Sequence, residues 1–148
     1  MTKATILAIA AVLAFAAAPA MAKTKAPKHK VAVQVNENDP KVMNLALNNV
    51  QNIFAYYKKK GETVSVEIVT YGPGLNMLRE DTSPVKARIS ELSIAQPTLK
   101  FDACANTHSK MELKEKKKIK LLSEAAIVPS GVIKLMELQE KGYTYLRP

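Results

Sequence analysis

The chain has 148 residues, of which 22 are basic, 13 are acidic and only one is a cysteine. A single cysteine excludes an internal disulfide, and two histidines without metal-ligand spacing predict neither a structural zinc site nor a cofactor. The formal net charge of +9 favours polyanionic partners, but the lysines are spread around predicted helices, so we expect no nucleic-acid partner.

The first 22 residues have the organisation of a secretory signal peptide. Lys3 precedes an apolar run from Ala4 to Ala18, and Ala20-Met21-Ala22 fits a cleavage site flanked by small residues. An uncleaved anchor is the alternative, but the run is shorter than the roughly 20 apolar residues of a membrane span. We expect an exported, periplasmic protein with no stable membrane insertion after cleavage, a flexible basic leader at residues 23–30 and one folded domain at residues 31–148.

The first part of the domain predicts a strand, a helix and a second strand. Valine-rich residues 31–35 are typical of a buried parallel strand, and Asp39-Pro40 supplies an N-cap and a first-turn proline for the next helix. Apolar residues recur every three or four positions between Lys41 and Lys60, and Gly61 ends the helix. Residues 64–69 form the second strand, whose alternation predicts one face less buried than the other.

The rest of the chain alternates in the same way. Residues 70–74 place two glycines around a proline, which lets backbone amides approach a ligand or a neighbouring chain, although a plain tight turn is the alternative. The later predicted elements are helices at residues 75–79 and from Ser83-Pro84 to about residue 94, a strand at 98–103, a helix at about 110–116, a strand at 126–128, a helix at 132–140 and a strand at 143–146.

Strands that alternate with helices predict a parallel sheet with right-handed crossovers. The expected fold is α/β: a flavodoxin-like, doubly wound, mostly parallel sheet of about five strands with helices on both faces. Ligands of such sheets gather beyond the carboxyl ends of the strands. The loops expected at that edge are residues 36–39, 70–74, 104–107 and 129–131.

The only cysteine lies at the predicted end of the third strand. Asn106, Thr107 and Ser109 follow it as candidate helix caps, so we expect backbone amides to point toward the thiol. Such donors, together with nearby cations, lower a thiol pKa and favour the nucleophilic thiolate. A small, buried and inert side chain is the alternative for Cys104.

Other side chains predict less chemistry. His108 is a candidate for stabilising the thiolate or moving a proton, and an exposed histidine at a helix start is the alternative. Asp102 lies on the same strand face as Cys104, where a carboxylate would raise the thiol pKa, so we interpret it as structural or interfacial. The remaining acidic residues form no evident carboxylate pair, and we interpret the lysine-rich stretch from Lys114 to Lys120 as a solvated face.

Four stretches between His29 and Pro148 carry a resemblance to a known family. They are the strand and helix from Val31 to Lys60, Tyr71-Gly72-Pro73-Gly74-Leu75, Phe101-Asp102-Ala103-Cys104-Ala105-Asn106-Thr107, and an ending from Val128-Pro129-Ser130-Gly131-Val132 to Glu137-Leu138-Gln139-Glu140-Lys141-Gly142-Tyr143. With these stretches the chain resembles the DsrE/DsrF-like family. The resemblance implies a flavodoxin-like fold, homo-oligomers such as trimers or hexamers, and a sulfur relay in which a cysteine accepts sulfane sulfur as a persulfide. The matching position is Cys104.

The leading hypothesis is a periplasmic persulfide carrier or sulfurtransferase-like protein in which Cys104 accepts sulfur from a donor protein or a small sulfur compound. The alternatives are a non-catalytic small-ligand-binding or oligomeric scaffold module, and a redox sensor joined through its thiol to another chain. Around the cysteine, the candidate binding residues are Gly72, Gly74, Asn106, Thr107, Ser130 and Gly131.

Overall fold

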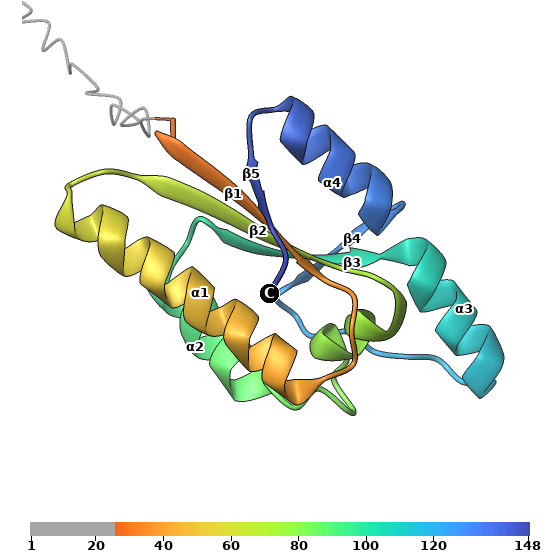
Figure 1. The fold of residues 1–148 in the computed structure, drawn as a ribbon. Helices are drawn as coiled ribbons and strands as arrows, with labels where there is room; N and C mark the ends of the chain where they lie inside the picture. Colours follow the sequence, from red (N-terminus) through yellow and green to blue (C-terminus); the bar gives the residue numbers. More distant parts are fainter. Residues whose placement is uncertain (1–25) are drawn as a thin grey trace, which may run out of the picture.

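The computed structural model describes residues 26–148 and shows a five-stranded sheet with helices on both faces (Figure 1). The strand order is β4-β3-β2-β1-β5, and every neighbouring pair is parallel. The predicted doubly wound α/β fold is confirmed. The predicted signal peptide and the first three residues of the predicted leader lie outside the described residues.

Strands and helices alternate along the chain. The strands are β1 (His29–Val35), β2 (Val64–Thr70), β3 (Leu99–Cys104), β4 (Ala125–Val128) and β5 (Thr144–Leu146). The helices are α1 (Pro40–Lys59), the 3-10 helix η1 (Gly72–Leu78), α2 (Lys86–Ala95), α3 (Ala105–Glu115) and α4 (Gly131–Glu140). None of the helices formed by residues 26–148 is long and apolar enough to cross a membrane.

The larger core lies on the face of the sheet that α1, η1 and α2 cover. The Asp39 carboxylate caps α1 by accepting the Lys41 amide at 2.7 Å, and Pro40 fits the first turn. The buried stripe of this helix consists of Met43, Ala46, Leu47, Val50 and Phe54. Each large apolar side chain buried there stabilises the fold by ~1.5–3 kcal/mol.

β2 is buried along its whole length, which corrects the prediction of one less buried face. The strand lies in the middle of the sheet, with the larger core on one face and α4 on the other. Its polar side chains are buried with partners, because the Ser65 hydroxyl donates to the Thr98 carbonyl and Glu67 pairs with a lysine of α4.

α4 covers the opposite face of the sheet. The chain leaves β4 at one edge and enters β5 at the other, so the helix crosses β3, β2 and β1 (Figure 1). Only a small second core lies beneath it, where Leu135 and Leu138 pack with Ala32 and Val69. The crossing starts beside β3 and places Gly131, the first residue of the helix, near the end of that strand.

α3 begins at Ala105, directly after the cysteine, whereas the sequence predicted a start at about residue 110. Cys104 takes the N-cap position, so Asn106 and Thr107 lie inside the first turn instead of capping a later one. None of the residues of α3 is buried, and the helix contacts β3 and η1. It therefore projects beyond the carboxyl edge of the sheet (Figure 1).

β1 begins at His29, so the strand includes the last two residues of the predicted leader. Glu62 pairs with Lys28 and with the His29 ring, and that ring stacks on Tyr57 with the ring centroids 3.8 Å apart. Composition alone predicted flexibility there, but these contacts extend the strand.

Candidate functional site

The predicted loops meet at the carboxyl edge of the sheet. Cys104 ends β3, Gly72 begins η1 after β2, and Gly131 begins α4 after β4. Val128 is the register partner of Cys104, which brings the turn at residues 129–131 beside the thiol. The parallel strands confirm the prediction that these loops share one edge.

The Cys104 thiol is covered by hydrogen-bond donors. The residue is 4% exposed, and burial raises the pKa of its thiol, but hydrogen bonds outweigh burial and hold the pKa below its ordinary value of 9.0. The donors are the Thr107 hydroxyl and the backbone amides of Gly131, Thr107 and Asn106. Two helix N-termini, those of α3 and α4, thus face the sulfur and stabilise its thiolate.

Thr107 links the thiol to the glycine loop. Its hydroxyl oxygen accepts the Gly72 amide at 3.0 Å, which leaves the hydroxyl proton free for the sulfur. Gly72 has a φ of +52°, in the left-handed region that favours glycine. The loop backbone therefore orients Thr107 to donate to a thiolate.

Gly74 and Gly131 allow close approaches that a side chain would block. A Cβ at Gly74 would lie 2.3 Å from the Val35 carbonyl oxygen, so η1 rests directly on the end of β1. A Cβ at Gly131 would lie 2.9 Å from the Cβ of Tyr71. The two glycines keep the loops packed around the thiol, while their predicted role in binding a ligand stays a prediction.

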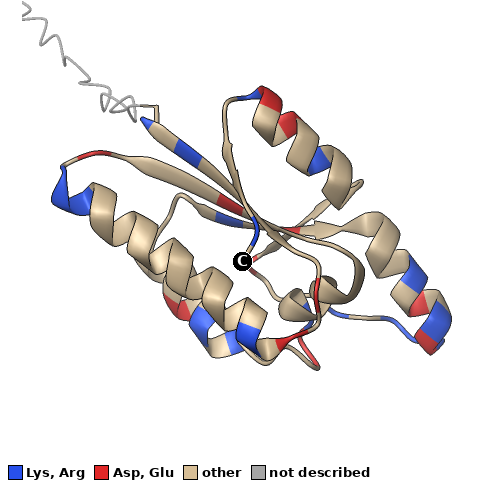
Figure 2. Cartoon of the chain, in the orientation of Figure 1, with Lys and Arg blue, Asp and Glu red and all other residues tan. Residues whose placement is uncertain are grey.

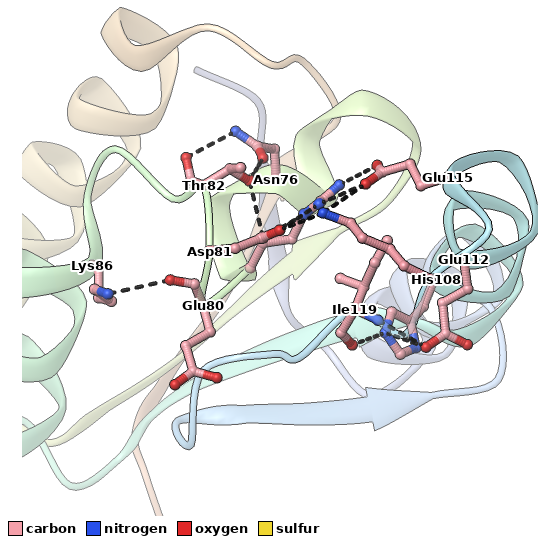
Figure 3. A network of polar contacts seen from close by, with 11 residues as sticks. Asn76, Glu80, Asp81, Thr82, Lys86, His108, Glu112, Glu115 and Ile119 are labelled. Carbon is pink, nitrogen blue, oxygen red and sulfur yellow. Dashed lines mark hydrogen bonds and ion pairs between the residues drawn. The ribbon is translucent and has the colours of Figure 1, made fainter.

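The side chains of three other predicted site residues are engaged elsewhere or exposed. His108 Nε2 lies 2.7 Å from the Ile119 carbonyl oxygen and 3.9 Å from Glu112 Oε1 (Figure 3). This ring joins α3 to the segment that follows it, and thiolate tuning by His108 stays a prediction. The Asn106 side chain is exposed, and only the backbone amide of this residue donates to the Cys104 sulfur. Ser130 is the N-cap residue of α4, but its side chain forms no capping hydrogen bond.

A buried ionic cluster lies beneath α4, and its member Asp102 precedes Cys104 by two residues in β3. Glu67 and Asp102 are each 3% exposed. Lys134 Nζ lies 2.7 Å from Glu67 Oε2 and 3.6 Å from Asp102 Oδ2, and the Tyr143 hydroxyl donates to Glu67 Oε1 at 3.0 Å. Lys134 follows Gly131 by about one helical turn, so the cluster fastens the helix whose first amide faces the sulfur.

The two buried carboxyls titrate differently. Burial raises the pKa of Asp102 to about 6, against the opposing Lys134 ammonium and with a further contribution from Glu67. Burial also raises the pKa of Glu67, but hydrogen bonds from Lys134 and Asp102 outweigh it and hold that pKa below its ordinary value. Of the two carboxyls, Asp102 is therefore the one that takes up a proton first as the pH falls.

Sequence analysis missed this carboxylate pair. Glu67 and Asp102 lie on different strands, and their proximity depends on the register that sets Val69 opposite Asp102 and Glu67 opposite Lys100. One signal was present in the sequence, because each carboxylate lies between two apolar residues of its strand. That the two carboxylates lie close together follows only from the register of β2 and β3.

A cavity of about 600 Å³ lies beside the site, between η1 and α3. One wall is a face of α3 with residues spaced three and four apart, namely Thr107, Lys110, Met111 and Lys114. The opposite wall includes Tyr71, Gly72, Pro73, Asn76 and Arg79. Cys104 does not line this cavity, but Thr107 lines it and its hydroxyl also donates to the sulfur.

Arg79 ties the far end of this cavity together. The buried guanidinium lies 2.8 Å from Asp81 Oδ2 and 2.9 Å from Glu115 Oε2. These hydrogen bonds raise the pKa of Arg79, lower that of Asp81, and lower the pKa of Glu115 to about 2. The arginine is thus fully engaged with carboxylates and holds η1 against α3.

Residues 26–148 contain no group of three side chains that could hold a metal ion. A sequence profile of the DsrE/DsrF-like family matches residues 10–148. A solved structure of a protein of unknown function from Methanobacterium thermoautotrophicum is 32% identical, with a TM-score of 0.69 over 81% of this chain and 99% of that chain. No curated protein matches the chain. The chain therefore belongs to the DsrE/DsrF-like family.

Proposed function

We propose that this chain is an exported sulfur carrier in which Cys104 accepts sulfane sulfur as a persulfide and hands it to an acceptor thiol. The observation that carries the proposal is the convergence of hydrogen-bond donors and two helix N-termini on the only thiol. A lowered pKa increases the thiolate fraction at neutral pH, and the thiolate is the attacking species in sulfur exchange. Membership of a family associated with sulfur relay supports this chemistry.

The exchange moves one sulfur atom without net oxidation. The Cys104 thiolate attacks the outer sulfur of a persulfide or polysulfide donor, and a new S–S bond forms. The S–S bond of the donor breaks, and its electron pair leaves on the donor thiolate. An acceptor thiolate then removes the outer sulfur from Cys104 by the same kind of attack, which regenerates the Cys104 thiolate.

Self-association is part of the proposal, as the trimers or hexamers of the family imply. Apolar side chains are exposed on β4 and on the outer face of α4: Ile127 at 61%, Val132 at 49%, Ile133 at 51% and Met136 at 52%. Contiguous exposed apolar side chains are typical of interaction surfaces. Val132 follows Gly131 directly, so a partner on this surface would lie next to the thiol site.

Cyanide, which releases sulfane sulfur as thiocyanate, tests the carrier function. Reduced protein is incubated with polysulfide, separated from the excess by gel filtration and treated with cyanide. We expect one thiocyanate per chain from the wild type and none from Cys104→Ser. Equal release from the two proteins, or no release from the wild type, would exclude a Cys104 carrier.

Export is tested separately from the chemistry. Cells that express the full chain are fractionated, and the N-terminus of the protein is sequenced. We expect the protein in the exported fraction, beginning at Lys23 after cleavage behind Ala22. An intact N-terminus on protein that stays in the cytoplasmic fraction would contradict export.

A further inference from the structure

We propose that the cavity between η1 and α3 binds the sulfur donor, and that this donor is an anionic organic persulfide of small-peptide size. The inference rests on the proposed carrier function and names the class of its substrate. It draws on three observations. The cavity has lysines without ion-pair partners among residues 26–148, it has apolar surface, and one of its lining residues, Thr107, donates to the thiol.

The free charge of the cavity is positive. Lys110 and Lys114 line it and form no ion pair among residues 26–148, whereas Lys117 and Lys118 further along the chain pair with acidic residues. The one carboxylate in the lining, Glu115, is already neutralised by Arg79. Figure 2 shows basic and acidic residues together on the second half of α3, so the charge left over depends on these ion pairs. Two lysines without partners favour a ligand with negative groups.

The reaction itself needs such cations. A persulfide donor and the Cys104 thiolate are both anions, and they repel each other as they approach. For a donor R–S–S⁻, the thiolate attacks the outer sulfur, the protein–S–S⁻ bond forms, and R–S⁻ leaves with the electron pair of the broken bond. Two negative charges enter this step and two leave it, so nearby ammonium groups lower its electrostatic cost throughout.

The shape and lining favour an organic donor over a bare inorganic anion. Tyr71 and Pro73 on one wall and Met111 on the opposite wall give the cavity apolar surface, which suits a carbon skeleton. Thr107 and Lys114 mark the two ends of the α3 wall, and the helical rise places them about 10 Å apart. A donor with its sulfur at Thr107 and a carboxylate at Lys114 therefore has the length of a short peptide. Thiosulfate is too short to reach both ends.

Thr107 connects this cavity with the reacting atom. It lines the cavity and its hydroxyl donates to the sulfur, while its oxygen accepts the Gly72 amide at 3.0 Å. Thr107 is therefore the side chain that has to turn for a donor in the cavity to reach the sulfur.

Binding of glutathione to the Cys104→Ser variant tests the site without any sulfur chemistry. Glutathione has two carboxylates and the expected length, and isothermal titration gives its Kd. We expect binding that weakens about five- to tenfold in Lys110→Gln and again in Lys114→Gln. Lys118→Gln is the matched control, because Lys118 lies outside the cavity, and it should leave the Kd unchanged. Thiosulfate should bind more weakly and be insensitive to Lys114→Gln.

The inference falls if glutathione does not bind, if the two cavity variants match Lys118→Gln, or if thiosulfate binds more tightly than glutathione with the same dependence on Lys114. These outcomes are independent of the carrier assay. Lysine-dependent glutathione binding with no thiocyanate from the wild type would keep the anion site and remove the carrier function. Thiocyanate release with lysine-independent binding would keep the carrier and remove this donor site.

Discussion

Replacement of Thr107 by valine removes one hydroxyl from the thiol site and keeps the shape of the side chain. The wild-type hydroxyl donates to the Cys104 sulfur and accepts the Gly72 amide at 3.0 Å. A hydrogen bond to a charged group stabilises it by ~1.5–3 kcal/mol, and 1.36 kcal/mol corresponds to about one pKa unit, so we expect the Cys104 pKa to rise by at least about one unit. The unpaired Gly72 amide should also cost ~1 kcal/mol of folding stability.

The pH dependence of alkylation by iodoacetamide measures this pKa, because only the thiolate reacts. We expect Thr107→Val to react at least about tenfold more slowly near neutral pH and at the wild-type rate once both thiols are ionised. Thr98→Val is the matched control, since the Thr98 hydroxyl donates to the Val64 carbonyl at the opposite end of β3. A folded Thr107→Val protein whose thiol titrates like the wild type would refute the account of the lowered pKa.

Three further predictions concern stability and assembly. Because burial raises the folded pKa of Asp102 to about 6 from 3.8, the folded state holds a proton that the unfolded state loses, and wild-type stability should fall as pH rises through that window. Urea titrations at pH 4 and 7 should therefore show Asp102→Asn gaining on the wild type by up to ~3 kcal/mol as pH rises; a loss for Asp102→Asn at pH 7 would contradict this. Asp81→Asn should be less stable than the wild type at both pH values, because Arg79 holds the pKa of Asp81 well below its ordinary value of 3.8 and the wild-type carboxylate stays ionised at pH 4. Gly74→Ala should cost ~3 kcal/mol or more because its Cβ meets the Val35 carbonyl oxygen at 2.3 Å, and Gly61→Ala, with open space around it, should cost only the ~1–2 kcal/mol of its positive φ; equal urea midpoints would show that the contact is not tight. Ile133→Lys combined with Met136→Lys should dissociate the proposed homo-oligomer in light scattering, and an unchanged mass would remove the α4 surface as the interface.

The sheet and most of the elements were predictable, because their signals are local. The valine-rich composition of residues 31–35 indicates a buried strand, and the capping pair Asp39-Pro40 indicates the start of α1. The place of Cys104 at a strand end also followed, since the apolar approach through Phe101 stops there. A parallel topology then predicts from the sequence alone that the four loops lie at one edge of the sheet.

What could not be predicted depends on contacts between distant residues. The sequence predicts too late a start for α3, because Asn106 and Thr107 are residues typical of an N-cap that precedes a helix. In the structure the end of β3 leads directly into the helix, and both residues lie in its first turn. The cluster of Glu67, Asp102 and Lys134 needs the sheet register and the crossing of α4 together. Sequence proximity makes His108 a candidate for tuning the thiolate, and that role stays a prediction. The contact of its ring with the Ile119 carbonyl could not be predicted, because no local pattern shows that the segment after α3 returns past the helix.

Intact-mass measurement through one loading and unloading cycle tests the central claim most directly. Reduced protein at neutral pH is weighed by mass spectrometry, incubated with polysulfide and weighed again, then given an acceptor thiol and weighed once more. The account predicts that the wild type gains the mass of one sulfur atom and loses it to the acceptor, and that Cys104→Ser gains none. A wild-type chain that gains no sulfur, or a Cys104→Ser chain that gains as much, would contradict a persulfide held at this edge of the sheet.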